Sequence, residues 1–109
     1  MKVEFLQTAQ PGLRWMVQYY RSNPQLDEAK AFASFAATER RIAELAPPKE
    51  TFWGIEGVWE AKILKTAFSF LYTIRGQTVF VIDIRDQRGL RSAAALRAFE
   101  QELRRRYEP

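Results

Sequence analysis

The sequence predicts a single α+β domain over residues 1–109, in which a helical hairpin packs on a mostly antiparallel four-stranded sheet and a further helix ends the chain. The expected order is β-α-α-β-β-β-α. Two segments with helical spacing of apolar residues lie on either side of Asn23-Pro24, three strand-like segments follow between residues 58 and 84, and an amphipathic segment follows Gly89. A hydrophobic fraction of 47% is sufficient for one buried core.

The chain begins with a short strand and a helix. Residues 1–6 alternate, with Val3 and Phe5 on one side, as in a half-buried strand. Pro11-Gly12 is expected to break the chain, because both residues are strong punctuators of regular structure. Apolar residues at helical spacing then predict a helix over residues 13–22.

A second helix is expected over residues 25–46. Asn23-Pro24 separates it from the first, because a residue before proline is disfavoured in the α region, and Pro47-Pro48 ends it. Its apolar stripe is Leu26, Ala29, Phe32, Ala33, Ala36, Ile42 and Leu45. The two helices therefore form a helical hairpin.

An irregular segment, residues 49–57, follows the hairpin. It carries three bulky apolar side chains, Phe52, Trp53 and Ile55. Such residues in a loop favour a lid packed on the core over a binding surface, although both interpretations remain open.

Three strands follow the loop. Residues 58–64 alternate, whereas residues 68–74 are almost wholly apolar, as expected for a central strand buried on both faces. The tight turn Arg75-Gly76-Gln77 leads into a β-branched strand over residues 78–84, with glycine supplying a positive φ. Alternation in this strand places Asp83 opposite Ile82 and Ile84, where it is exposed or paired with Lys62. Tyr72 is expected to be a core residue.

The last segment is predicted to be a helix with Ser92 as its N-cap. Its apolar stripe is Ala95, Leu96, Phe99, Leu103 and Tyr107. Residues 85–109 carry seven arginines against four acidic residues, which is +3 of the net charge of +4. Such a cluster can attract phosphate backbones or acidic protein surfaces, or it can be a solvated face in which Arg85 or Arg88 pairs with Asp83 or Asp86.

Composition excludes several kinds of site. The chain has no histidine, which removes the usual neutral-pH general base and the commonest metal ligand. It has no cysteine, so disulfides and thiolate metal sites are excluded and a cytoplasmic location is expected. No metal or cofactor is expected, and no apolar run has the length of a membrane span.

The order of the elements and several short motifs resemble the RelE/ParE superfamily of bacterial toxins, the toxic halves of type II toxin–antitoxin pairs. The motifs are Tyr19-Tyr20 before Asn23-Pro24, IAELAP at residues 42–47, GVWEAK at residues 57–62 and FSFLYTIRGQTVFVIDIRDQRG at residues 68–89. The resemblance implies a toxin that is held silent by a cognate antitoxin, in a toxin–antitoxin hetero-oligomer.

The resemblance favours the ParE-like branch, whose members inhibit DNA gyrase. RelE-like members instead cut mRNA on the ribosome, and their apparatus is incomplete here. Phe68-Ser69-Phe70 stands where RelE-like chains place an arginine, and residues 92–95 lack the expected aromatic residue. A RelE-like endoribonuclease and a non-toxic basic binding domain of the same fold remain the alternatives.

These interpretations define three sets of candidate site residues. A ribonuclease would use Lys62, Lys65 and Arg88. The candidate target contacts are Arg85, Arg88, Arg91, Arg97, Arg104 and Arg105. The expected antitoxin anchors are Trp15, Tyr19, Phe32, Phe52 and Trp53.

Overall fold

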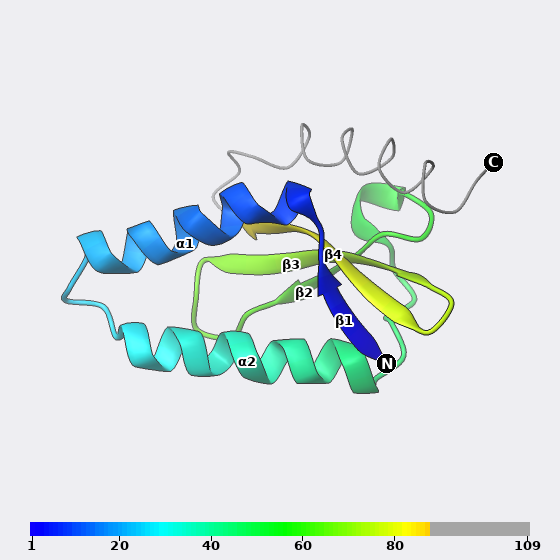
Figure 1. Cartoon of the computed structure of the whole chain (residues 1–109), viewed down its shortest axis with the longest axis horizontal. Coiled ribbons are helices and arrows are strands. Elements are labelled where there is room, and N and C mark those ends of the chain that lie inside the picture. The colour runs from blue at the N-terminus through cyan, green and yellow to red at the C-terminus, as the bar shows by residue number, and fades with distance from the viewer. Residues whose placement is uncertain (88–109) are drawn as a thin grey trace.

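The computed structural model describes residues 1–87, and within them the chain has an α+β fold with two α-helices and a four-stranded mixed sheet (Figure 1). The helix expected after Ser92 lies outside the described residues. The elements are β1 (Lys2–Phe5), the 3-10 turn η1 (Gln7–Ala9), α1 (Gln10–Ser22), α2 (Glu28–Glu44), the 3-10 turn η2 (Phe52–Gly54), β2 (Trp59–Lys62), β3 (Phe68–Arg75) and β4 (Thr78–Asp86).

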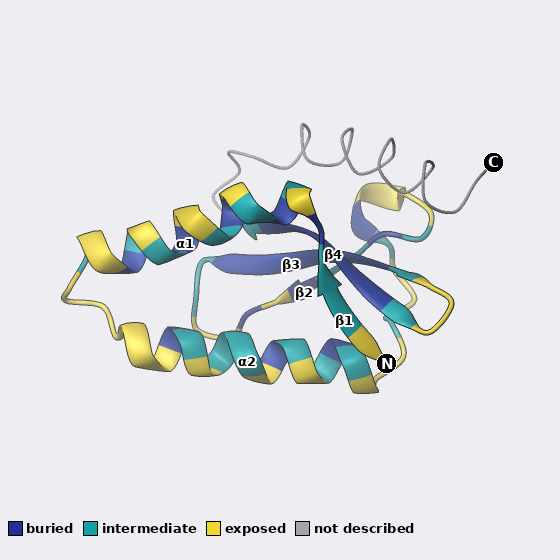
Figure 2. Ribbon diagram, in the orientation of Figure 1, coloured by how far each residue is buried: buried dark blue, intermediate teal, exposed yellow. Residues whose placement is uncertain are grey.

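The sheet has the strand order β1-β4-β3-β2. β1 runs parallel to β4, whereas β4 with β3 and β3 with β2 are antiparallel pairs. The expectation of a central strand is confirmed, because residues 68–73 of β3 are all buried (Figure 2). Gly76 in the following turn has a φ of 60°, a conformation that favours glycine.

Both helices begin at different residues from those predicted. α1 begins at Gln10 rather than residue 13, because Pro11 lies in its first turn, where a missing N–H breaks no helical hydrogen bond. α2 begins at Glu28, because the Asp27 side chain accepts a hydrogen bond from the Lys30 N–H at 3.0 Å and caps the helix. No helix among residues 1–87 is long and apolar enough to cross a membrane.

The later start of α2 also corrects its expected apolar stripe. Leu26 precedes the helix and is exposed, and Ala29 is exposed as well. Ala31 and Ile42 are the buried apolar residues of α2, and Phe32 packs partly against the core. At the start of α2, the side that faces the core therefore carries Ala31 rather than the predicted Ala29.

Apolar side chains pack on both faces of the sheet. On the face covered by the helices, Met16 and Tyr20 of α1 and Ile42 of α2 meet strand residues such as Phe68 and Phe70. The other face carries a smaller cluster made of Leu6, Phe52, Val58, Leu71, Phe80 and Ile82. The η2 turn and the loop that follows it thus contribute Phe52 and Val58 to the second cluster.

A register shift in the β3–β4 pair overturns the expectation for Asp83. The pairing changes between Leu71, which lies opposite Asp83, and Tyr72, which lies opposite Val81. An extra residue on one strand breaks the alternation of side chains, so Ile82 and Ile84 belong to different clusters. Asp83 is fully buried rather than exposed, in the row of Leu71 and Glu60. Lys62 is exposed and lies in a different row, opposite Ser69.

Candidate functional site

A carboxylate connects β2 to β4 across the central strand. Glu60 of β2 lies opposite Leu71, and cross-strand partners share a face of the sheet, so Glu60 projects on the face of the smaller apolar cluster. Its Oε2 accepts hydrogen bonds from Ser69 Oγ and from Arg85 Nη1, each at 2.7 Å. We call this arrangement of Glu60, Ser69 and Arg85 the Glu60–Arg85 link.

The link is largely shielded from water. The side chains of Glu60 and Arg85 are only 20% and 16% exposed, and Ser69 is fully buried. Charges in such a place are screened weakly by salt, and each depends on its partner for compensation. Arg85 was a candidate target contact and was expected to pair with Asp83 or Asp86 if it faced solvent; its ion pair is made with Glu60.

Two aromatic rings lie over Arg85. The rings of Phe52 and Trp53 are stacked with centroids 4.9 Å apart, and the Arg85 guanidinium carbon lies 5.1 Å from the first and 5.9 Å from the second. These distances suit cation–π attraction. The Glu60–Arg85 link therefore holds the η2 turn against the sheet as well as joining two strands.

The two aromatic residues of the η2 turn have opposite exposures. Phe52 is buried in the smaller cluster, and its N–H donates to the Val58 carbonyl at 2.7 Å. Trp53 is 69% exposed and has a φ of 50°, in the left-handed region. The interpretation of this loop as a packed lid is confirmed for Phe52, whereas Trp53 is exposed.

The two candidate lysines line different hollows. Lys62 is exposed at the end of β2, and it lines a hollow of about 220 Å³ together with Arg41 and Tyr72. Lys65 is exposed in the β2–β3 loop with a φ of 61° and lines a separate groove beside the helices. Lys62 and Arg85 do lie in one row of the sheet, on either side of Ser69.

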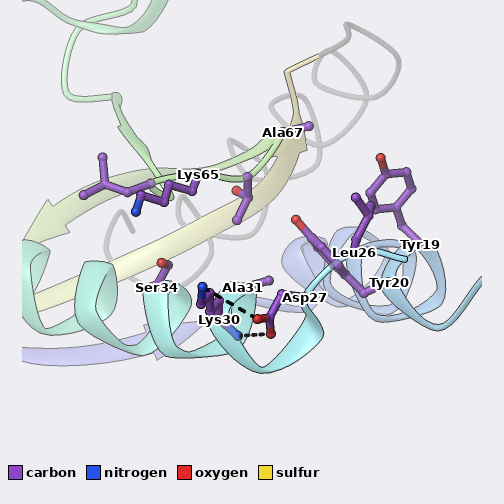
Figure 3. A pocket seen from close by; sticks show the side chains of 11 residues that line it. Tyr19, Tyr20, Leu26, Asp27, Lys30, Ala31, Ser34, Lys65 and Ala67 are labelled. Atoms are coloured by element: carbon purple, nitrogen blue, oxygen red, sulfur yellow. Dashed lines mark hydrogen bonds and ion pairs between the residues drawn. The ribbon is translucent and has the colours of Figure 1, made fainter. Parts of the chain in front are cut away.

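The groove that contains Lys65 lies at the end of the helical hairpin where the turn joins α1 to α2, and it has a volume of about 400 Å³ (Figure 3). Tyr19, Tyr20 and Leu26 line it from the α1 side, and Lys30, with its 4.0 Å ion pair to Asp27, lines it from α2. The groove thus combines apolar walls with ammonium groups at its rim.

The remaining expected anchors have different degrees of exposure. Trp15 is 41% exposed, and its indole N–H donates to Asp86 Oδ2 at 3.0 Å. Tyr19 and Phe32 are half-buried and pack against the main core, each in edge contact with the ring of Tyr20. Arg88, Arg91, Arg97, Arg104 and Arg105 lie outside the described residues.

Tyr72 is a core residue, as expected from its place in the central strand. It is buried, and burial raises the pKa of its hydroxyl above the usual value of 10.0, while the positive charge of Arg41 offsets part of the rise. Its ring packs beside Trp59 with centroids 5.9 Å apart. At neutral pH the hydroxyl keeps its proton.

Sequence reasoning missed the Glu60–Arg85 link. Glu60 and Arg85 are 25 positions apart and belong to strands that are not neighbours in the sheet. The small buried Ser69 between them leaves the room that the contact needs. The only sequence signal was a serine between two phenylalanines in an otherwise apolar strand.

Comparison of the chain with protein-family models, with curated proteins and with solved structures finds no match. The site is therefore interpreted from its own geometry.

Replacing Glu60 by alanine should lower the free energy of unfolding by about 1–3 kcal/mol, because it removes two hydrogen bonds and the charge that compensates a largely buried guanidinium. Glu56→Ala is the matched control, since Glu56 is exposed in the adjacent loop, and it should change the value by less than about 0.5 kcal/mol. Urea unfolding followed by circular dichroism measures both. Equal effects of the two substitutions would show that the link does not stabilise the fold.

Proposed function

We propose that this protein is a ParE-like toxin of the RelE/ParE fold, which inhibits DNA gyrase and is neutralised by a cognate antitoxin. The observation that carries the proposal is the sequence pattern of residues 19–89 together with a fold whose described elements follow the expected order. The proposal includes a C-terminal helix that presents its arginines to the target.

The described residues favour inhibition by contact over RNA cleavage. Phe68, Ser69 and Phe70 are all fully buried, so the stretch where RelE-like chains place an arginine presents no side chain to a substrate. Tyr72 is buried with a raised pKa, and Arg85 is held by Glu60. A general base must reach the proton it removes and must be deprotonated when it does so, which Tyr72 does not satisfy at neutral pH.

A neutralising partner would find apolar anchors beside the helices. Trp15, Leu26 and Leu64 are exposed apolar side chains, and the groove beside the turn of the hairpin is lined by Tyr19 and Tyr20. A disordered antitoxin tail that folds on binding would bury such residues, because aromatic anchors dominate interface energies. Trp15, Tyr19 and Phe32 remain the proposed contacts on this side, and the exposed Trp53 is the proposed contact beside the opposite face of the sheet, where Phe52 is buried.

The experiment is a gyrase supercoiling and DNA-cleavage assay with the purified full-length chain. We expect dose-dependent inhibition or trapped cleavage complexes, reduced about tenfold or more when Arg104 and Arg105 are both replaced by alanine, because arginines in a contact surface are common hot spots. The matched control replaces the exposed Arg14 and Arg21 of α1 and should leave inhibition unchanged. Removal of residues 96–109 should abolish inhibition.

The same purified protein also distinguishes the alternative functions. An absence of any effect on gyrase at high protein excess would refute the proposal. Cleavage of ribosome-bound mRNA that is lost in Lys62→Ala or Arg88→Ala would instead establish the RelE-like ribonuclease. Harmless expression without antitoxin, with neither activity, would leave a non-toxic basic binding domain.

A further inference from the structure

A hollow of about 300 Å³ lies beside the η2 turn, on a part of the surface with an unusual combination of side chains. The six described residues that line it are Pro48, Glu50, Thr51, Phe52, Trp53 and Glu60. They include two glutamates and no basic side chain, although the whole chain carries a net charge of +4. The hollow therefore combines an exposed tryptophan with two carboxylates, of which Glu60 is paired with Arg85 beside the hollow and Glu50 is exposed.

The indole of Trp53 is held in place at the edge of this hollow. Its ring stacks on the buried Phe52 at an interplanar angle of 14°, and hydrogen bonds from Phe52 N–H to Val58 and from Ile55 N–H to Phe52 fix the turn on both sides. The residue nevertheless remains 69% exposed (the η2 turn carries both buried and exposed residues in Figure 2). A large ring that is already ordered loses little conformational entropy when a partner binds.

Arg85 shows which ligand chemistry suits these groups. Its guanidinium is bound by one carboxylate and lies over the two stacked rings. Both hydrogen bonds of Glu60 are accepted by Oε2, so Oε1 takes part in neither, and Glu50 is exposed at the same hollow. A planar guanidinium both stacks on aromatic faces and donates in parallel to carboxylates, which an ammonium group cannot do.

We propose that this hollow binds an arginine side chain from a basic segment of a partner protein, with the guanidinium stacked on Trp53 and facing Glu50 and Glu60. Charge complementarity selects this occupant over nucleic acid, whose bases would also stack on an exposed tryptophan. The carboxylates of Glu50 and Glu60 outnumber the guanidinium of Arg85 beside them, which disfavours a phosphate backbone. The inference is independent of the proposed gyrase target.

The test uses the full-length chain labelled with ¹⁵N and the probe N-acetyl-arginine amide, with N-acetyl-citrulline amide as its uncharged isostere. The chain has three tryptophans, so each indole N–H gives its own signal. We expect arginine amide, and not citrulline amide, to shift the Trp53 indole signal and the amide signals of residues 50–53. Equal shifts with citrulline amide would overturn the proposal, as would arginine-dependent shifts spread over other acidic residues but missing at Trp53.

Two pairs of variants sharpen the result. Glu50→Gln should weaken the binding of arginine amide about threefold, whereas Glu56→Gln in the same loop, which does not line the hollow, should leave it unchanged. Trp53→Ala should weaken it about tenfold, and the exposed Leu64→Ala should not. Unchanged binding in Glu50→Gln and Trp53→Ala refutes the site. A short oligothymidylate that shifts the Trp53 indole more strongly than arginine amide would assign the ring to nucleic acid instead.

Discussion

Replacing Phe70 by alanine is expected to unfold a large fraction of the molecules at 37 °C. Phe70 is fully buried in the middle of β3, and its ring meets Phe35 of α2 at 4.8 Å and Phe5 of β1 at 5.9 Å, both in edge-to-face contact. Truncation of such a residue costs about 3–5 kcal/mol, against a total stability of about 5–15 kcal/mol for a domain of this size. Thermal and urea unfolding followed by circular dichroism would measure the loss.

Phe32→Ala is the matched control for this substitution. Phe32 lies on α2 and is only half-buried, whereas Phe70 is fully buried. The ring of Phe32 contacts that of Tyr20 at a centroid distance of 6.2 Å. Its replacement should cost about 1 kcal/mol. If Phe32→Ala were the more destabilising of the two, the assignment of Phe70 to the centre of the core would be wrong. Phe32 is also a proposed antitoxin contact, so the variant should bind antitoxin less tightly while remaining folded.

The sequence predicted the elements well where one local signal dominated. The apolar run of β3 and the β-branched residues of β4 allow few alternatives to buried strands, and Gly76 marks the turn between them. The predicted first residues of both helices were wrong, because two local signals competed at each of them. Pro11 can break a chain or begin a helix, and only the packing of α1 on β4 decides between the two. Asp27 is a strong N-cap, yet Leu26 before it extended the apolar pattern.

The register shift between β3 and β4 is a feature that alternation alone does not predict. A period of two assigned Ile82 and Ile84 to one face, whereas the shift places them in two clusters and leaves Asp83 buried between them. A bulge is specified by how two strands twist against their neighbours, and such pairwise information is not contained in one strand. The expected exposure of Asp83 was wrong for the same reason.

The candidate site was predicted only in part because it depends on strand order. The aromatic pair Phe52-Trp53 and the cation Arg85 were each selected from the sequence, but as members of different sites. Their contact follows from a sheet in which β3 separates β2 from β4, so that Glu60 reaches across Ser69. The sequence selected Phe52 and Trp53 together without showing that the first is buried in the core and the second is exposed.

The close packing of α1 on β4 leads to the second prediction. Thr8 Oγ1 donates to the Ile82 carbonyl at 2.6 Å, and Trp15 donates to Asp86 at 3.0 Å. Gly12 lies between them in sequence, beside Ile84. The steps from Thr8 to Gly12 and from Gly12 to Trp15 are three or four helical residues, and each advances about 5–7 Å, as two residues of strand do. The η1 turn and the start of α1 therefore run along β4. The backbones approach so closely at the middle contact that only glycine fits.

Gly12→Ala should therefore destabilise the protein by about 2–3 kcal/mol, as expected for overpacking against a rigid backbone. An added Cβ would lie 2.5 Å from the Ile84 carbonyl oxygen and 2.6 Å from Asp83 Oδ1. Helix propensity predicts the opposite sign, because alanine within a helix is favoured over glycine by about 1 kcal/mol. The sign of the change, measured by urea unfolding, thus distinguishes tertiary packing from local preference.

Gly54→Ala controls for the loss of glycine itself. An added Cβ at this position meets no atom within 4 Å, and only the positive φ of 69° opposes it, at about 1 kcal/mol. A Gly12→Ala variant that is as stable as the wild-type protein would mean that α1 does not lie this close to β4. The close approach at Gly12 also brings the indole N–H of Trp15 within hydrogen-bonding distance of Asp86. The same result would therefore also argue against that hydrogen bond.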